Sequence, residues 1–147
     1  MKYLISFLFV LWFGNSSNDN ETVLKFDIVR NKRVLGSLEA SRAVSGSKTY
    51  YKSFTQINTR LVKRIKVDYK YDVVFNNGHM RKADVRIMVN DKLHAETNTE
   101  WKNTEYRIVE NNEQEITLTD QISHATILLY FEEPTTIKST YSEQDAS

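Results

Sequence analysis

Apolar side chains recur at every second position through most of the chain after residue 20, which is the period of a strand with one buried face. Val, Ile, Thr, Tyr and Phe, the residues that favour strands, are abundant there. The alternation is strongest between Leu61 and Val89, where aliphatic and tyrosine side chains at odd positions alternate with charged side chains at even positions. The pattern therefore predicts a series of antiparallel strands rather than helices.

The parity of the apolar positions also predicts how the first two strands pair. Their apolar residues carry even numbers, so a hairpin buries them together only if the numbers of facing residues have an even sum. A three-residue loop over residues 31–33 meets this condition. The expected facing pairs are Leu24 with Ala40, Phe26 with Leu38, and Ile28 with Gly36.

Two later hairpins are predicted in the same way. A three-residue loop ending at Gly78, which takes a positive φ at little cost, keeps the odd-numbered apolar residues on one face. A two-residue turn at Asn90-Asp91 would mix the faces of the next pair, so an odd-length loop or a bulge from Asn90 to Lys92 is predicted. The expected facing pairs are Val67 with Ile87, Tyr69 with Val85, Tyr71 with Ala83, Val89 with Leu93, and Ile87 with Ala95.

One segment departs from this rhythm. The stretch from Asp120 to Phe131 is apolar on nearly every side at its end, so periodicity leaves both a helix and a buried strand open. A short helix is favoured, because Asp120 could cap it, Pro134 could stop it, and a curved sheet with one apolar face needs a cover. The other expected elements are strands near residues 49–59, 105–110, 114–118 and 135–141, and a polar end at residues 142–147.

Together these elements predict a mainly β fold. The expected architecture is a strongly curved antiparallel sheet, or an incomplete β-barrel, of roughly seven to nine strands with one short helix packed on the concave side. No repeat of longer period and no low-complexity linker indicates a second domain. Residues 17–147 are therefore predicted to form a single β-rich domain.

The N-terminus is predicted to be an export signal. Met1-Lys2 supplies a positive start, residues 3–13 are uncharged and largely apolar, and small residues at positions 14 and 16 suit a cleavage site. A membrane span needs about 20 apolar residues, so this run is too short to be an anchor. We therefore expect a signal peptide over residues 1–16 and an exported chain, periplasmic or extracellular, with no transmembrane span after cleavage.

The composition removes several classes of function. The chain has no cysteine, which excludes disulfides, thiolate metal sites and a cysteine nucleophile. The balance of 20 Lys+Arg against 19 Asp+Glu argues against a nucleic-acid partner. Four glycines leave no phosphate-binding loop, and no serine lies in a nucleophile elbow. His79, His94 and His124 fall in three different predicted elements, so no metal site, cofactor or enzyme activity is predicted.

A group of basic residues between Arg60 and Lys70 has more than one interpretation. Tyrosines interleave with it, as on a platform that stacks nucleic-acid bases. However, the tyrosines lie on the opposite face from Lys66 and Lys70, and Asp68 and Asp72 neutralise the basic row. We therefore interpret the row as a solvated strand face. Attraction of its first residues to anionic lipid headgroups is the alternative.

The predicted inward face mixes large aliphatic and tyrosine side chains with small or hydroxyl-bearing ones. A well-packed core contains the same mixture, so a filled sandwich is one interpretation. The other is a curved sheet that leaves an apolar cavity, with hydroxyl groups to orient a ligand. The candidate ligand-lining residues are Val67, Tyr69, Tyr71, Ile87, Thr97, Thr99 and Trp101.

Four blocks of the sequence carry a resemblance to known proteins. KFDIVRNKRVLGSLEAS (25–41), IKVDYKYDVVFNNG (65–78), TILLYFEEP (126–134) and YSEQD (141–145) resemble an uncharacterised family of short secreted bacterial proteins. That family is a domain of unknown function, so the resemblance implies no catalytic residue, cofactor or partner. More distantly, the opening hairpin with Leu35-Gly36 is similar to periplasmic β-rich proteins whose sheets curl around a helix, some of which are thought to handle envelope lipids.

One departure from that family concerns the C-terminus. Its members continue beyond the YSEQD block with a glycine after the aspartate, whereas this chain reads Asp145-Ala146-Ser147. The resemblance therefore implies a truncated or divergent member. Such a member is expected to have an exposed sheet edge where later strands would pair.

The function expected from the sequence is that of a secreted or periplasmic protein that binds an apolar or lipid-like ligand in a half-barrel. The alternative is a structural or protein-interaction module of the cell envelope, with a filled core and no ligand. Neither expectation includes catalysis, and protein partners are not predicted.

Overall fold

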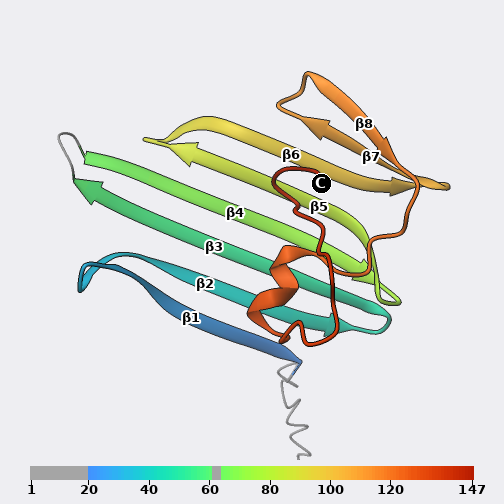
Figure 1. Cartoon of the computed structure of the whole chain (residues 1–147), viewed down its shortest axis with the longest axis horizontal. Coiled ribbons are helices and arrows are strands. Elements are labelled where there is room, and N and C mark those ends of the chain that lie inside the picture. The colour runs from blue at the N-terminus through green and yellow to red at the C-terminus, as the bar shows by residue number, and fades with distance from the viewer. Residues whose placement is uncertain (1–19, 61–63) are drawn as a thin grey trace, which may run out of the picture.

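Figure 1 shows eight antiparallel strands in one sheet, in which each strand pairs with its neighbour along the chain. The computed structural model describes residues 20–60 and 64–147. The predicted signal peptide, residues 1–16, lies outside the described residues. The strands are β1 (Glu21–Arg30), β2 (Arg33–Ser45), β3 (Lys48–Arg60), β4 (Arg64–Asn76), β5 (His79–Val89), β6 (Lys92–Lys102), β7 (Glu105–Glu110) and β8 (Gln114–Leu118).

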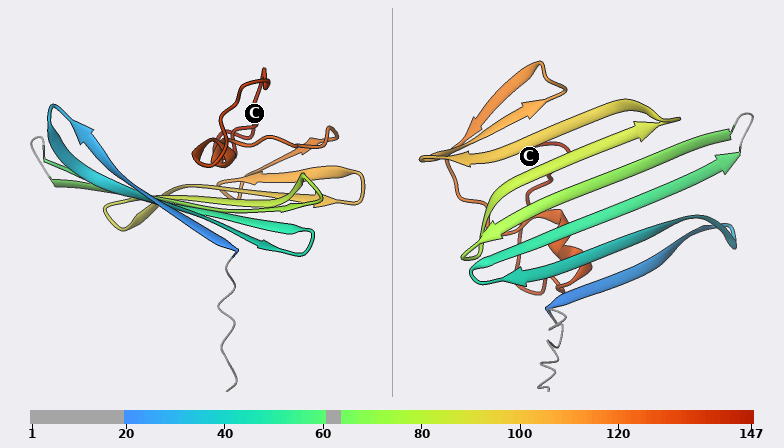
Figure 2. Two further views of the ribbon diagram at one scale, coloured as in Figure 1. Left: turned by 90° about the horizontal axis from the view of Figure 1, so that it is seen from below. Right: turned by 180° about the vertical axis from the view of Figure 1, so that it is seen from behind.

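The predicted fold class is confirmed, because the protein is mainly β and its eight strands form a single open sheet. The sheet is twisted, and β1 and β8 lie at its opposite edges (Figure 2). A short 3-10 helix, η1 (Thr126–Tyr130), lies over one face of the sheet against β3. Residues 119–147, which we call the C-terminal cover, follow β8 and lie on this same face.

Three hairpins use a two-residue turn, where the sequence analysis predicts a three-residue loop for the first two and an odd-length loop or a bulge for the third. Both central residues of each turn have a positive φ. Asparagine opens every one of these turns, and its short polar side chain tolerates the left-handed region, so glycine is not required. An extra residue in the following strand then forms a bulge, and beyond the bulge the numbers of facing residues again have an even sum. The turns are Asn31-Lys32, Asn77-Gly78 and Asn90-Asp91, and the extra residues are Leu35, Arg81 and His94.

The first hairpin and part of the third pair as predicted. In the β1–β2 pair, the three expected facing pairs are all present. In the β5–β6 pair, Ile87 faces Ala95 as predicted, but Val89 faces Lys92 and not Leu93. The difference arises because the bulge at His94 lies inside β6 and not at the turn.

The β4–β5 register is the clearest correction. The predicted pairs are wrong by two residues, because a two-residue turn and a bulge at Arg81 replace the three-residue loop. The parity is nevertheless right, so the same side chains share a face. The observed pairs are Val67 with Val89, Tyr69 with Ile87, Tyr71 with Val85, and Val73 with Ala83.

Gly36 is required where β2 approaches β3. A Cβ atom at this position would lie 2.0 Å from the backbone carbonyl oxygen of Gln56. Backbone atoms cannot move aside as a flexible side chain can, so a larger residue would separate the two strands. Gly36 follows directly after the bulge residue Leu35, and it allows this irregular stretch to stay in the sheet.

The helix prediction is right in place and wrong in extent. η1 has five residues, and Asp120 does not cap it, because the cap position is Ala125. Residues 120–124 are extended or irregular, and the strand predicted near residues 135–141 is absent from the described structure. There, only Tyr141 forms a single parallel bridge, with Ala125. The cover therefore packs through individual side chains and not as a regular element.

Strand parity sorts the apolar side chains onto the face that carries the C-terminal cover, which we call the inner face. The hydrophobic core lies where the cover meets this face. The sheet contributes seven of its buried side chains and the cover four. Its buried residues are Tyr51, Val73, Phe75, Met80, Ala83, Tyr106 and Ile108 from the sheet, and Ile122, Ala125, Ile127 and Tyr141 from the cover.

Candidate functional site

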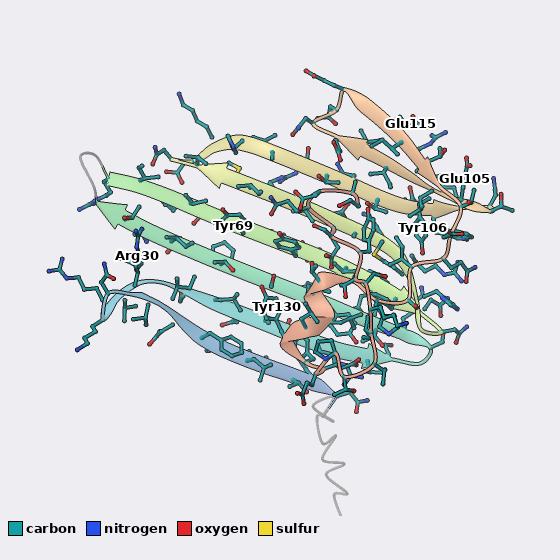
Figure 3. All side chains as sticks on the ribbon, in the orientation of Figure 1. Arg30, Tyr69, Glu105, Tyr106, Glu115 and Tyr130 are labelled. Carbon is teal, nitrogen blue, oxygen red and sulfur yellow. The ribbon has the colours of Figure 1, made fainter. Side chains whose placement is uncertain are left out.

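Tyr106 fixes the start of the C-terminal cover on the sheet (Figure 3). Its side chain is fully buried, and its hydroxyl donates a hydrogen bond to the Met80 carbonyl at 2.7 Å. The same hydroxyl accepts the backbone N–H of Ile122 at 3.1 Å. The Met80 N–H donates to the Ile122 carbonyl at 2.8 Å. Because these groups are buried, losing any of the bonds would leave a polar atom unpaired in the core.

Glu143 fixes the far end of the cover. Its side chain is fully buried, and its carboxylate accepts the backbone N–H of Thr126 at 3.1 Å and that of Ile127 at 3.0 Å. It also accepts the Thr126 hydroxyl. These N–H groups start η1, where no helical carbonyl can accept them. The carboxylate thus does the work of a helix cap, which Ala125 cannot do.

Three of the candidate ligand-lining residues hydrogen-bond to the cover. The Tyr71 hydroxyl donates to Oε1 of Gln144 at 3.0 Å, and the Thr97 hydroxyl donates to the Gln144 carbonyl at 2.9 Å. The hydroxyl oxygens of Thr99 and Tyr141 lie 3.1 Å apart and share a hydrogen bond. In this half of the inner face, the hydroxyl groups orient a segment of the chain itself.

Burial raises the pKa of Tyr71 to about 12, and the negative charge of Glu143 contributes as the second cause. Both effects disfavour the phenolate, one by removing water and the other by repulsion. Burial also raises the pKa of Tyr130 and of Tyr141. The three phenols around Glu143 therefore stay protonated well above neutral pH, and Tyr71 keeps its hydrogen atom for Gln144.

Trp101 also belongs to the covered half of the inner face. Its ring packs edge-on against Tyr106, with ring centroids 4.7 Å apart. The Arg81 guanidinium lies 6.0 Å from the centre of the same ring. Trp101 is therefore engaged by its own neighbours in the sheet.

The other three candidate residues lie further along the same face. Ile87 is buried between its facing residues, Tyr69 in β4 and Ala95 in β6. Val67 and Tyr69 are only partly buried, and Figure 3 shows Tyr69 at mid-strand, to one side of the cover. The structure thus divides the seven candidates between a covered and an open part of one face.

The inner face continues beyond the cover as an apolar surface. Figures 1 and 2 show that the cover lies over one half of the sheet, while no described segment lies over the half toward the β1–β2 turn. Apolar side chains of β1 to β4 reach solvent here, and Phe26 is 46% exposed. We call this surface the open apolar face, and its residues are Phe26, Ile28, Leu38, Ile57, Val67 and Tyr69.

A basic hollow lies at the turn end of the open apolar face (Figure 3, Arg30). Its volume is about 440 Å³, and Arg30 and Arg33 face each other across the β1–β2 hairpin. Within residues 20–60 and 64–147, no carboxylate forms an ion pair with either arginine. Like charges directly opposite one another repel, so an anion between them would be stabilising. The hollow is lined by Arg30, Asn31, Arg33, Leu35 and Thr59.

The opposite face of the sheet, the outer face, carries charges that pair with one another. In β4, the ammonium of Lys66 lies 3.0 Å from the Asp68 carboxylate, and that of Lys70 lies 3.1 Å from Asp72. A hollow of about 350 Å³ on this face is lined mainly by such pairs. These ion pairs support the interpretation of the row as a solvated strand face. The other pairs in the hollow are Lys82 with Asp84 and Arg86 with Glu96.

The described part of the chain contains no group of three His, Cys, Asp or Glu side chains placed to hold a metal ion. Its histidines are separate: His79 is in β5, His94 in β6 and His124 in the cover. Nor does any helix among these residues have the length and apolar character needed to cross a membrane.

One family model matches the sequence over residues 26–147, and its description is "Domain of unknown function (DUF6134)". The chain belongs to this family. The resemblance that the four sequence blocks indicate is therefore confirmed, and the matched residues run from within β1 through the C-terminal cover. The chain matches no curated protein and no solved structure.

Two features of the site are absent from the sequence analysis. Glu143 and Gln144 fall in a stretch predicted to be a polar end, yet one is buried and the other binds two strands. The signals in the sequence are Tyr141, an aromatic residue in otherwise polar surroundings, and the YSEQD block (141–145) that carries part of the family resemblance. The pairing of Arg30 with Arg33 depends on the two-residue turn, which the parity argument alone does not predict.

Proposed function

We propose that the protein is exported and binds an anionic single-chain amphiphile, such as a fatty acid, along the open apolar face. The alkyl chain would lie on the apolar side chains of β1 to β4. The acid group would reach the basic hollow at Arg30 and Arg33. This role is binding and does not include catalysis.

The observation that carries the proposal is the division of one apolar face into two halves. β3 and β4 supply both halves, yet among the described residues a segment packs on only one of them (Figure 2). A contiguous apolar patch exposed to water marks an interaction surface. An alkyl chain suits this patch, because it needs no hydrogen-bond partner and gains about 25 cal/mol for each Å² of apolar surface removed from water.

The basic hollow is the reason for an anionic ligand. Arginine binds a carboxylate through two parallel hydrogen bonds, and the two arginines that face each other here have no ion-pair partner in the part of the chain that the structure describes. The hollow and the open apolar face are continuous, because Thr59 in the hollow lies on the same face of β3 as Ile57, two residues away. A single extended molecule could therefore contact both.

Titration with a fluorescent long-chain fatty acid tests the apolar part of this site. Ile57→Ser removes a central side chain of the open apolar face, and we expect affinity to fall about tenfold. Phe54→Ser is the matched control, because Phe54 is a 47% exposed apolar residue on the outer face of the same strand. An equal loss in both variants, or no saturable binding to the unmodified protein, would contradict the proposal.

A second pair of titrations tests the basic hollow. Arg33→Gln keeps a polar side chain but removes the charge, so affinity for a fatty acid is expected to fall about tenfold. Affinity for the fatty alcohol of the same chain length is expected to stay the same. A similar change for both ligands would show that the acid group does not bind at Arg33.

The alternative function is that of a structural or protein-interaction module without a ligand. The observation in its favour is that Tyr71, Thr97 and Thr99 already have partners within the chain. Native mass spectrometry of protein purified from the producing cells separates the two proposals. The amphiphile proposal expects an adduct of lipid mass that the Ile57→Ser variant loses, and the alternative expects the mass of the polypeptide alone.

A further inference from the structure

β1 forms an edge of the sheet, and Figure 1 shows no described segment beyond it. The Val44 N–H of β2 donates to the Asn20 carbonyl at 3.3 Å, so the backbone of residue 20 points toward β2. Backbone direction alternates along a strand, so even-numbered residues of β1 bond to β2. The N–H and C=O groups of the odd-numbered residues, from Val23 to Val29, therefore point to the free edge. Such an edge is a template for another strand.

The free edge restricts how a second copy of β1 can pair with it in the antiparallel direction. Outward-pointing odd residues must meet odd residues of the other copy, so the numbers of facing residues must have an even sum. A register centred on Lys25 places that lysine opposite itself, and one centred on Asp27 does the same for the aspartate. Like charges directly opposite one another are unfavourable. A register centred on Phe26 avoids both conflicts.

In the register centred on Phe26, the sequence of β1 is complementary to itself. Lys25 faces Asp27 of the second copy, and by symmetry Asp27 faces Lys25 of the second copy. Because the numbers of facing residues have an even sum, inner-face residues of one copy also lie opposite inner-face residues of the other. The remaining facing pairs are Val23 with Val29 and Leu24 with Ile28.

The side chains near this centre are ones that a second copy would cover. Phe26 is 46% exposed and Val29 is 57% exposed, which is high for large apolar residues. The exposed ring of Tyr130 lies beside Phe26, with ring centroids 6.4 Å apart. Lys25 contacts Glu39 at 3.0 Å, whereas no cation in the described ranges forms an ion pair with Asp27. A second copy supplies that cation.

We propose that two copies of the chain associate by antiparallel pairing of β1 with β1, about a two-fold axis at Phe26. The two sheets then form one continuous sheet, with both inner faces on the same side. Backbone hydrogen bonds give the affinity, and the Lys25–Asp27 pairs fix the register. The association goes beyond the proposed binding of an amphiphile and does not depend on it.

Charge variants test the partner and the register together. Lys25→Asp and Asp27→Lys each place like charges opposite one another in both symmetric pairs, so each raises the dimer dissociation constant about tenfold. Mixing the two variants in equal amounts places every aspartate opposite a lysine, and the dimer returns. Sedimentation equilibrium compares the unmodified protein, each variant and the mixture. A monomeric unmodified protein, an Asp27→Lys variant that dimerises normally, or a mixture that stays monomeric would overturn the proposal.

A disulfide test reads the register directly, since the chain has no cysteine of its own. Phe26→Cys places two thiols across the axis in a non-hydrogen-bonded pair, where Cα atoms lie about 4.5 Å apart, within disulfide range. Val23→Cys is the matched control, because Val23 is also 46% exposed but lies roughly 20 Å from its counterpart. Mild oxidation should link Phe26→Cys into dimers and leave Val23→Cys mostly monomeric. Equal cross-linking of both variants would overturn the register.

The outcomes also separate this inference from the proposed function. Ile57→Ser changes the open apolar face and leaves β1 intact, so it should weaken fatty-acid binding without changing the dimer. Asp27→Lys changes the free edge on the outer side, so it should weaken the dimer without abolishing fatty-acid binding. Loss of the dimer in Ile57→Ser would contradict pairing through β1.

Discussion

The two halves of the inner face belong to one sheet and share β3 and β4, but they differ in what completes them. In the covered half, Met80, Tyr106 and Ile108 are fully buried. In the open half, Ile57 and Val67 point to the same side of the sheet and remain partly exposed. The alternation of apolar and polar residues is similar in both. The comparison shows that strand parity decides which side chains share a face, and that a separate segment decides whether the face becomes core.

The largest expected difference is between two isoleucine truncations. Ile108→Ala removes a fully buried side chain beneath the cover, so unfolding free energy should fall by about 4 kcal/mol. Ile57→Ala removes the same atoms from the open half, where unfolding free energy should fall by only about 1 kcal/mol. Urea denaturation of both variants measures this. Equal losses would mean that the halves are equally packed, and the comparison would fail.

Removal of the buried carboxylate should come next. Glu143→Ala leaves the N–H of Ile127 and the hydroxyl of Thr126 without their acceptor, while the N–H of Thr126 keeps the Tyr141 carbonyl, so stability should fall by about 2 kcal/mol. Glu133→Ala is the control, because Glu133 is an exposed acid of the same segment, and it should change stability by less than about 0.5 kcal/mol. Thermal unfolding followed by circular dichroism compares the two. A Glu143→Ala protein as stable as the control would show that the carboxylate does not hold η1.

The raised pKa of Tyr71, in the covered half, predicts how the free energy of unfolding depends on pH. The pKa of Tyr71 is about 12 in the folded protein, above the ordinary value of 10.0, so the folded state keeps a proton that the unfolded state loses. This contribution to stability is complete below pH 10 and is lost as the pH rises toward 12. Urea denaturation between these limits should show a decline that Tyr71→Phe reduces. An identical decline in Tyr71→Phe would contradict the assignment.

The smallest expected effect concerns a single hydroxyl. Thr97→Val leaves the Gln144 carbonyl without its donor and should lower stability by about 1 kcal/mol. Thr55→Val changes a threonine of the inner face in the open half, where a neutral or slightly stabilising effect is expected. Denaturation midpoints of the two variants measure the contrast. A larger loss for Thr55→Val would reverse the comparison.

Much of the sheet could be predicted from the sequence, because parity is a local property. The positions of β7 and β8 and the faces of β1, β2, β4, β5 and β6 follow from it directly, whereas β3 was predicted only as a strand. The β4–β5 register could not, since it depends on whether Asn77-Gly78 forms a two-residue turn with a bulge at Arg81 or a longer loop. Both arrangements keep the same faces together, so the apolar pattern does not distinguish them.

The sequence predicts that a short helix covers the sheet, but the contacts that hold the cover were beyond sequence reasoning for a different physical reason. Its structure is held by single long-range contacts, such as Glu143 with the start of η1 and Gln144 with Tyr71. Such contacts have no sequence period, and a polar residue that finds a buried partner looks like any surface residue in the sequence. The candidate ligand-lining residues could therefore be placed on one face, but not divided between its covered and open halves.

The division of the inner face can be tested most directly by thiol labelling, because the chain has no cysteine. Val67 and Val73 lie on the same face of β4, one partly exposed and the other 1% exposed beneath the cover. The V67C thiol should react with a water-soluble maleimide within about tenfold of the rate in an unfolded peptide, and V73C at least about a hundredfold more slowly than V67C, because the cover must first open. Equal rates at the two positions would contradict the account.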